Sequence, residues 1–486
     1  MDRRDGRPTE RDEMDALGDA YSRKYDRGGR SRARGPSFGA GGGARAPVRA
    51  SAGPPVGHVS RSHEQNEEYM DEMHSAYGLG PREQLRTRVA DGGPLGRDSS
   101  ARRGGAAAAG SGAAGGFAGG PAVGDLPRLS SAWVAGPSDP AGTVIDLSGR
   151  PVLCSALDPS RRRVALGCSD HAVYELSLDS GRVIRTLFTK RYGHCEWVTS
   201  VAYLADGTLA SAAMDAKICV WSPSGVRCTD MTGHSGSISA LVGIGTSIVS
   251  TGYDQTVRVW DSRSGAETAL LAGHRAPVLC VAVDGASRAV TGGRDALACA
   301  WDIGAGARIG RMAGHKGHVT AARWLGDGVT RGDGGGAGDL FATGAQDGHV
   351  RVWDLRARRA VANVAVHVTE AGAGAVGDIG VCTATSPFDV VTSGADQRVC
   401  VLDSRRGFSV RWSMDEHRDY VYSLAVGGRI ALSGAGDGTL LAHDVVAGRP
   451  LWALGANEAA VRCIECDGDT VVASGDDGNA IVYKAG

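Results

Sequence analysis

The sequence predicts an all-β fold built from repeated strand units and preceded by an arm without a core. From about residue 143 onward, short runs of alternating apolar residues are separated by Gly, Asp and Ser, which is typical of strands and turns. One pattern recurs eight times at intervals of about 40 to 50 residues, as expected of a radial or stacked repeat architecture. Glycine is frequent, with 74 residues, whereas aromatic residues make up 5% of the chain, and this favours turns over long helices.

Composition argues against several classes of function. The net charge of −1 gives no overall attraction to nucleic acid or to an anionic membrane. No run of about 20 apolar residues is present, so we expect no membrane insertion. The amino-terminal residues lack the apolar segment of a secretory signal, and the 11 cysteines lie mostly in apolar runs. We therefore expect reduced thiols and a cytoplasmic protein, with the cilium, the cytoskeleton or the nucleus as alternative locations.

The predicted arm covers residues 1–128, which are rich in Gly, Ala, Arg, Pro and Ser. Such a segment buries too little apolar surface to offset the entropy cost of ordering, so disorder is expected. Near 9–25 and 64–79, apolar residues recur at helical spacing, and these segments are candidate helices that fold on a partner. The first fifty residues are basic, so nucleic acid is a candidate partner of the arm alone.

The repeated pattern places an acidic residue at the same point of each unit. These residues are Asp170, Asp215, Asp254, Asp295, Asp347, Asp396, Asp437 and Asp477. A Gly-His pair precedes four of the units, and a Trp follows the Asp by six residues in the same four. This arrangement resembles the WD40 repeat family, over residues 143–486. The resemblance implies a β-propeller, for which we expect eight blades, with seven as the alternative.

In that family a His, a hydroxyl of the second strand, the turn Asp and a Trp of the third strand hydrogen-bond in series and brace the blade. Four units carry the full set of residues. They are His194, Ser211, Asp215 and Trp221; His234, Ser250, Asp254 and Trp260; His274, Thr291, Asp295 and Trp301; and His315, Thr343, Asp347 and Trp353. The set recurs, whereas a catalytic triad occurs once, so we expect a scaffold that is not an enzyme and has no cofactor, metal or small-molecule substrate.

The remaining units depart from the set. Unit 6 has Leu402 and unit 7 has His443 in place of the Trp, while units 1 and 8 keep little beyond the Asp. We expect these blades to depend more on packing and on ring closure. A strand-like segment at 142–149 can supply the outer strand that the last unit lacks. The Gly-rich segments 327–338 and 369–378 are expected to be linkers, the first of them between the first two strands of unit 5.

Partner binding is expected on the top face, which this family builds from the loop after each Gly-His and from the turn that carries the Asp. Large side chains there are not needed for the core, so they are informative about binding. The candidates for a protein or peptide site are Trp197, Met214, Tyr253, Arg294, His318 and Tyr420.

The opposite face offers a second candidate site. Residues 353–356, Trp-Asp-Leu-Arg, are similar to the WDxR motif of substrate receptors of cullin-4 ubiquitin ligases, in which the Arg contacts the ligase adaptor. Arg356 and Arg263 would have this role here. Our prediction is a non-enzymatic scaffold that mediates protein–protein interactions within a multiprotein complex. The alternatives are such a substrate receptor and a structural component of a ciliary, axonemal or RNA-processing assembly.

Overall fold

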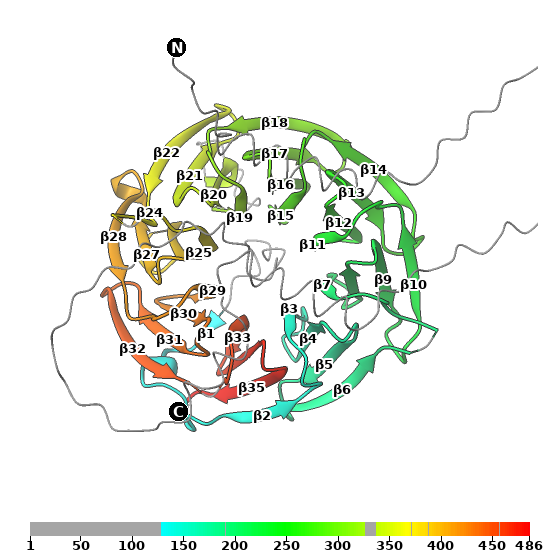
Figure 1. Cartoon of the computed structure of the whole chain (residues 1–486), viewed down its shortest axis with the longest axis horizontal. Helices are drawn as coiled ribbons and strands as arrows, with labels where there is room; N and C mark the ends of the chain where they lie inside the picture. The colour runs from blue at the N-terminus through cyan, green and yellow to red at the C-terminus, as the bar shows by residue number, and fades with distance from the viewer. Residues whose placement is uncertain (1–127, 190, 326–336, 371, 387, 456) are drawn as a thin grey trace, which may run out of the picture. The chain divides into compact units, whose positions relative to one another are not determined.

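The computed structural model describes residues 128–486 except 190, 326–336, 371, 387 and 456. Within this part of the chain, eight sheets are arranged in a ring (Figure 1), and inner strands line a central channel. The structure therefore confirms an all-β propeller with eight blades and excludes the seven-bladed alternative. The predicted arm and its two candidate helices lie outside the described residues, apart from Arg128.

Blades 1 to 7 are antiparallel sheets whose four strands run from the inner channel to the outer rim in chain order, and blade 8 follows this order in its first three strands. Blade 1 comprises β3 (Val152–Leu157), β4 (Arg163–Cys168), β5 (Val173–Ser177) and β6 (Arg182–Leu187). Blade 2 comprises β7 (Val198–Tyr203), β8 (Leu209–Ala213), β9 (Lys217–Trp221) and β10 (Cys228–Thr232). Blade 3 comprises β11 (Ile238–Ile244), β12 (Ser247–Gly252), β13 (Thr256–Asp261) and β14 (Glu267–Ala272). Blade 4 comprises β15 (Val278–Val283), β16 (Arg288–Gly293), β17 (Leu297–Asp302) and β18 (Ala307–Ala313).

The second half of the ring follows the same plan. Blade 5 comprises β19 (Val319–Trp324), β20 (Leu340–Ala345), β21 (His349–Asp354) and β22 (Arg359–Ala365). Blade 6 comprises β25 (Val376–Cys382), β26 (Asp389–Gly394), β27 (Val399–Asp403) and β28 (Ser409–Met414). Blade 7 comprises β29 (Val421–Gly427), β30 (Ile430–Ala435), β31 (Leu440–Asp444) and β32 (Arg449–Leu454). Blade 8 comprises β33 (Val461–Gly468), β34 (Thr470–Gly475) and β35 (Asn479–Lys484).

The hydrophobic core lies between neighbouring blades. The buried cluster that contains Val249 of blade 3 also contains Cys299 of blade 4, and the cluster around Ile430 of blade 7 also contains Ile481 of blade 8. Strands buried on both faces carry apolar or small residues at nearly every position, as in β15, where all six residues are buried. The core is thus a ring of blade-to-blade contacts around the channel.

The first described residues close the ring. Strand β2 (Thr143–Asp146) pairs antiparallel with β35, with Thr143 opposite Val482, and this confirms the predicted outer strand. An additional strand, β1 (Arg128–Leu129), pairs in parallel with the inner strand β33 and precedes the short 3₁₀ helix η2 (Ser131–Val134). Sequence reasoning missed β1 and η2, which lie ahead of the predicted start of the propeller at residue 143.

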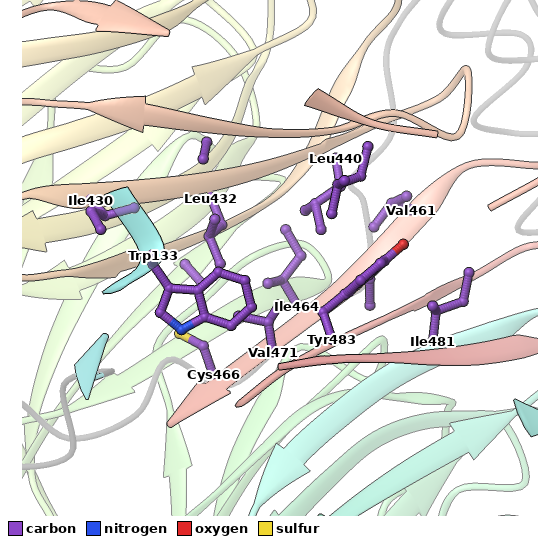
Figure 2. Close-up of a cluster of buried hydrophobic side chains, with 14 residues drawn as sticks. Trp133, Ile430, Leu432, Leu440, Val461, Ile464, Cys466, Val471, Ile481 and Tyr483 are labelled. Atoms are coloured by element: carbon purple, nitrogen blue, oxygen red, sulfur yellow. The ribbon is translucent and has the colours of Figure 1, made fainter. Parts of the chain in front are cut away.

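Trp133 of η2 anchors this segment under blades 7 and 8. Its indole is fully buried against Leu432, Ile464 and Cys466, as Figure 2 shows. The indole N–H donates to the carbonyl of Gly468 at 3.0 Å, and Trp452 donates its own indole N–H to the carbonyl of Trp133 at 2.7 Å. The buried ring of Trp133, with its indole N–H and the carbonyl of the same residue both hydrogen-bonded, holds the start of the folded chain to its end.

The two Gly-rich segments have different outcomes. Residues 326–336 lie outside the described residues. The strands on either side, β19 and β20, are the first two strands of blade 5, as predicted, and the 3₁₀ helix η3 (Ala337–Asp339) directly precedes β20. The prediction of a linker at 369–378 was wrong in part, because β23 (Val368–Thr369) and β24 (Gly372–Ala373) form a hairpin. Gly372 has a φ of +129°, which only glycine adopts without strain.

The remaining helical turn, η4 (Ser404–Arg406), follows β27. No helix among the described residues is long and apolar enough to cross a membrane.

We predict that Trp133→Ala destabilises the propeller by about 3 to 5 kcal/mol, because it empties a fully buried site and leaves the Gly468 carbonyl without the indole donor. Val144→Ala, at a β2 position that is 56% exposed, should change stability by less than about 0.5 kcal/mol. Urea unfolding of the full chain measures both values. Equal effects of the two substitutions would contradict the anchoring role of Trp133.

Candidate functional site

Blades 2 to 5 contain a hydrogen-bonded series that runs from the third strand to the top loop. In blade 2, the indole of Trp221 donates to Ser211 Oγ at 2.8 Å, Ser211 Oγ lies 2.8 Å from His194 Nε2, and His194 Nδ1 lies 3.1 Å from Asp215. Because indole N–H only donates and carboxylate only accepts, the protons point from Trp through the hydroxyl and the imidazole to the Asp. The same contacts occur at 2.8 to 3.2 Å in blades 3, 4 and 5.

The Asp also fixes the loop that follows the His. Asp215 accepts the backbone N–H of Cys195 at 3.1 Å, and Asp295 accepts that of Arg275 at 2.9 Å. Hydrogen bonds from His and from backbone N–H groups hold the pKa of Asp295 below its usual range, even though burial opposes this. These four sets therefore brace the blades, and their polar groups are occupied with one another.

The other blades use different residues. In blade 6, His367 contacts Thr392 and Asp396 at 2.9 and 2.7 Å, and Leu402 has no donor to add. In blade 7, Ser433 Oγ lies between His417 Nε2 and His443 Nε2, at 2.6 and 2.8 Å.

Blades 1 and 8, at the seam, keep little of the series. In blade 8, Asn457 donates to Asp477 at 3.2 Å. Blade 1 instead buries Glu175, which accepts hydrogen bonds from Arg163, Arg185 and Tyr203 at 2.7, 2.5 and 2.8 Å. A buried carboxylate with three donors takes over the bracing role there.

The two predicted top-face positions are joined in every blade by a main-chain hydrogen bond. The residue before the turn Asp donates its N–H to the carbonyl of the residue just before the inner strand of the same blade, as in Tyr253 to Ser237 at 2.9 Å and Arg294 to Pro277 at 2.8 Å. The other pairs are Ser169 to Pro151, Met214 to Trp197, Gln346 to His318, Ala395 to Ala375, Gly436 to Tyr420 and Asp476 to Ala460, at 2.8 to 3.0 Å.

The candidates differ in what they present to a partner. Tyr253 and Arg294 are exposed, whereas Met214, His318 and Tyr420 are half-buried. The expectation of an exposed aromatic at Trp197 was wrong, since its side chain is only 8% exposed. Trp197 directly precedes Val198, which is fully buried at the start of β7. The large apolar ring of Trp197 is buried together with that strand.

Three of the candidates form a row across blades 3, 4 and 5. The guanidinium carbon of Arg294 lies 5.2 Å from the centroid of the Tyr253 ring, in the range of a cation–π contact. Burial lowers the pKa of His318, and the nearby charge of Arg294 lowers it further. We call Tyr253, Arg294 and His318 the top row.

Sequence reasoning missed two cations beside the top row. Arg275 and Lys316 directly follow the Gly-His pairs of blades 4 and 5, and both are exposed. Their backbone N–H groups are held by Asp295 and Asp347, so each side chain starts from a fixed point on the loop. The sequence could have pointed to these two cations, because the residue after each Gly-His pair lies on the loop that the turn Asp holds.

The channel mouth at blades 7 and 8 has a separate cluster. The rings of Tyr420 and Tyr422 pack at a tilt of 38° with centroids 4.3 Å apart. Arg462 lies 4.4 Å from the Tyr422 centroid and pairs with Asp476 at 2.7 and 2.9 Å. The adjoining channel cavity has a volume of about 230 Å³ and includes Glu465, whose pKa burial raises to about 7.

The predicted adaptor residues lie at the opposite end of the blades. Arg356 is exposed, but it forms an ion pair with Asp339, which also pairs with the buried Arg288. Arg288 in turn lies 4.9 Å from the Trp324 ring centroid. Arg356 thus belongs to a cluster within the propeller, whereas Arg263 is exposed on the hairpin between β13 and β14.

Comparisons with known proteins match the repeats and several relatives. The family described as "WD domain, G-beta repeat" matches residues 181–222, 225–261 and 306–354. Telomerase protein component 1 of Rattus norvegicus is 28% identical over 129 residues, 26% of this chain and 5% of that protein. Mitochondrial division protein 1 of Aspergillus terreus is 26% identical over 249 residues, 51% of this chain and 27% of that protein. Ribosome biogenesis protein YTM1 of Vanderwaltozyma polyspora is 29% identical over 128 residues, 23% of this chain and 28% of that protein. The matches thus span less than a third of each of these relatives.

Solved structures share the fold. The computationally designed Ika8 protein aligns with a TM-score of 0.58 and 23% identity, over 70% of this chain and 98% of that one. The structure of U3-55K aligns with a TM-score of 0.50 and 19% identity, also over 70% and 98%. At these identities the likeness concerns the fold alone.

Blade 7 should make the protein sensitive to acid. Burial lowers the pKa of His417 to about 4, and burial together with His417 lowers that of His443 to about 3. Between pH 6.5 and 4 the unfolded chain binds protons on these residues while the folded blade does not. The free energy of unfolding therefore decreases as the pH is lowered through this range. His417 alone accounts for a loss on the order of 3 kcal/mol.

The matched variant is His443→Leu, since blade 6 already has Leu402 at this position. It should show a smaller loss of stability between pH 6.5 and 4 than the wild type. Denaturant unfolding across this pH range measures the difference. The same dependence of the unfolding free energy on pH in both proteins would contradict the role assigned to His443.

Proposed function

Because the chain carries WD40 repeats folded as an eight-bladed propeller, we propose that it is a non-enzymatic scaffold that binds an acidic segment of a partner protein at the top row, within a multiprotein complex. The relatives have names that refer to telomerase, mitochondrial division and ribosome biogenesis. Such different processes are consistent with a shared binding module and not with a shared reaction.

The contact between Arg294 and Tyr253 is the observation that carries this proposal. Both side chains are exposed, and they come from neighbouring blades, so a partner that covers them contacts two rigid turns at once. Arg and Tyr are the residue types that dominate binding energy at protein interfaces. Their backbones are fixed by main-chain hydrogen bonds, which reduces the entropy lost on binding.

Charge gives the chemistry of the partner. Arg275, Arg294 and Lys316 are exposed, and no ion pair joins them to an acid within the described part of the chain. The acids that hold the loops of Arg275 and Lys316, Asp295 and Asp347, are turned inward, with side chains 7% and 11% exposed. This part of the top face is therefore positive, and an acidic segment complements it.

The ligase-receptor alternative would use Arg263 and Arg356 at the other end of the blades. Arg356 already has Asp339 as its partner within the propeller, and this favours the top row over the WDxR motif. Binding of nucleic acid by the basic arm involves residues outside those described. The partner recovered by co-purification would tell whether the complex is ciliary, RNA-processing or of another kind.

We predict that Tyr253→Ala with Arg294→Glu reduces the amount of co-purified partner about tenfold or more, since a hot-spot pair is lost and a charge is reversed. Quantitative mass spectrometry after affinity purification of the full chain measures this. Recovery of the same partners from the wild type should also decrease as salt increases, because the contact is electrostatic.

The control is Arg263→Ala with Arg356→Ala, which should retain these partners. Both double variants should keep the melting temperature of the wild type to within a few degrees, as exposed substitutions do. Full retention of partners by the top-row variant, with loss in the control, would reject this proposal in favour of the ligase-receptor alternative.

A further inference from the structure

Two thiols and a carboxylate meet on the outer half of blade 2. Strands β9 and β10 pair with Cys219 opposite Asp230 and Trp221 opposite Cys228. Alternate residues of a strand share a face, so Cys219, Cys228 and Asp230 lie on the same side of the sheet. The two Sγ atoms and a carboxylate oxygen of Asp230 all lie within 4.8 Å of one another.

The spacing of these atoms fits a tetrahedral zinc site. Asp230 Oδ1 lies 3.5 Å from Cys219 Sγ and 3.3 Å from Cys228 Sγ. With Zn–S bonds of about 2.3 Å and Zn–O bonds of about 2.0 Å, tetrahedral angles place sulfur and oxygen about 3.5 Å apart. The donors therefore already stand near the distances that a bound ion requires.

A neighbouring lysine holds the carboxylate in this orientation. Lys217 Nζ lies 3.0 Å from Asp230 Oδ2 and donates to the carbonyl of Gly193 at 2.6 Å. This leaves Oδ1 directed at the two sulfurs.

The fourth position of the site is open. His194 Nδ1 lies 3.9 Å from Cys219 Sγ, but this nitrogen already contacts Asp215 at 3.1 Å in the bracing series. Water, or a group of a partner, would complete the coordination. Cys228 is half-buried, whereas Cys219 is buried, so an ion can enter from the Cys228 side.

A disulfide fits this geometry less well. Cys219 and Cys228 are diagonal neighbours across the strand pair, for which Cα separations are about 7 to 8 Å. Disulfides usually need Cα separations of about 4.4 to 6.8 Å. Two sulfurs that share a zinc ion are about 3.8 Å apart, which a diagonal pair can reach without moving the backbone.

The arrangement is particular to blade 2 among the blades with a cysteine at this strand position. Cys299 of blade 4 faces Arg311, and Cys400 of blade 6 faces Ser413. Neither has a second thiol and a carboxylate grouped with it in the described part of the chain. The repeat therefore does not require the group, and the bracing series does not use the side chains of Cys228 and Asp230.

We propose that Cys219, Cys228 and Asp230 bind Zn²⁺ and thereby clamp the outer strand β10 to β9. Strand β10 has five residues and pairs with β9 without a register shift. A metal ion across the pair would add a strong link at an otherwise short edge.

Titration of the reduced, metal-free full chain with Zn²⁺ and Co²⁺ tests this. We expect one equivalent of Zn²⁺ to bind, to raise the melting temperature, and to displace Co²⁺ that shows a thiolate charge-transfer band with tetrahedral d–d bands. Cys228→Ser, at a half-buried position, should keep the fold and lose the Co²⁺ band. Asp230→Asn should weaken Zn²⁺ binding about tenfold or more.

The matched control is Cys299→Ser, which removes a thiol from the equivalent strand position in blade 4 and should leave Zn²⁺ binding unchanged. Equal Zn²⁺ binding by the wild type and by Cys228→Ser would overturn the proposal. So would a Co²⁺ spectrum without sulfur charge transfer, or formation of a Cys219–Cys228 disulfide in a protein that binds no Zn²⁺.

Discussion

Closure of the ring is the constraint on which the rest of this propeller depends. The eight blades pack against their neighbours, so each buried cluster is shared by two blades. An open ring would leave one face of blade 1, one face of blade 8 and one sheet edge uncovered. The chain solves this by returning its first folded residues to its last blade, through contacts between Trp133 and Gly468 that are 335 residues apart in sequence. These contacts bring the first folded residues to the last two blades.

The blades next to the seam are those that depart furthest from the bracing series. Blades 2 to 5 each carry the Trp-to-Asp series, whereas blade 8 keeps only the Asn457–Asp477 contact and blade 1 relies on Glu175. In blade 8 the added strands β1 and β2 give a five-stranded sheet. A blade can thus be held in place by hydrogen bonds within it or by contacts between the two ends of the chain, and the blades at the seam use the second.

The architecture could be predicted because it is repeated. The Asp that recurs eight times predicted the number of blades, and the missing last strand pointed to residues 142–149. Trp133 could not be predicted, because it occurs once and acts through contacts distant in sequence. Trp197 was misjudged because strand position does not tell how far a ring is covered. The Cys219, Cys228 and Asp230 group was missed because it needs the register of β9 and β10, which depends on the hairpin between them.

The main-chain hydrogen bond between the two top positions of each blade has a consequence for how such a protein can change. It involves only N–H and carbonyl groups, so neither side chain is required for it, and the eight blades hold residues as different as Pro277, Arg294, Gly436 and Asp476 there. Mutation can therefore replace the recognition surface while the structural residues beneath stay the same. Substitutions at these positions alone would be enough to produce a new specificity on an unchanged frame.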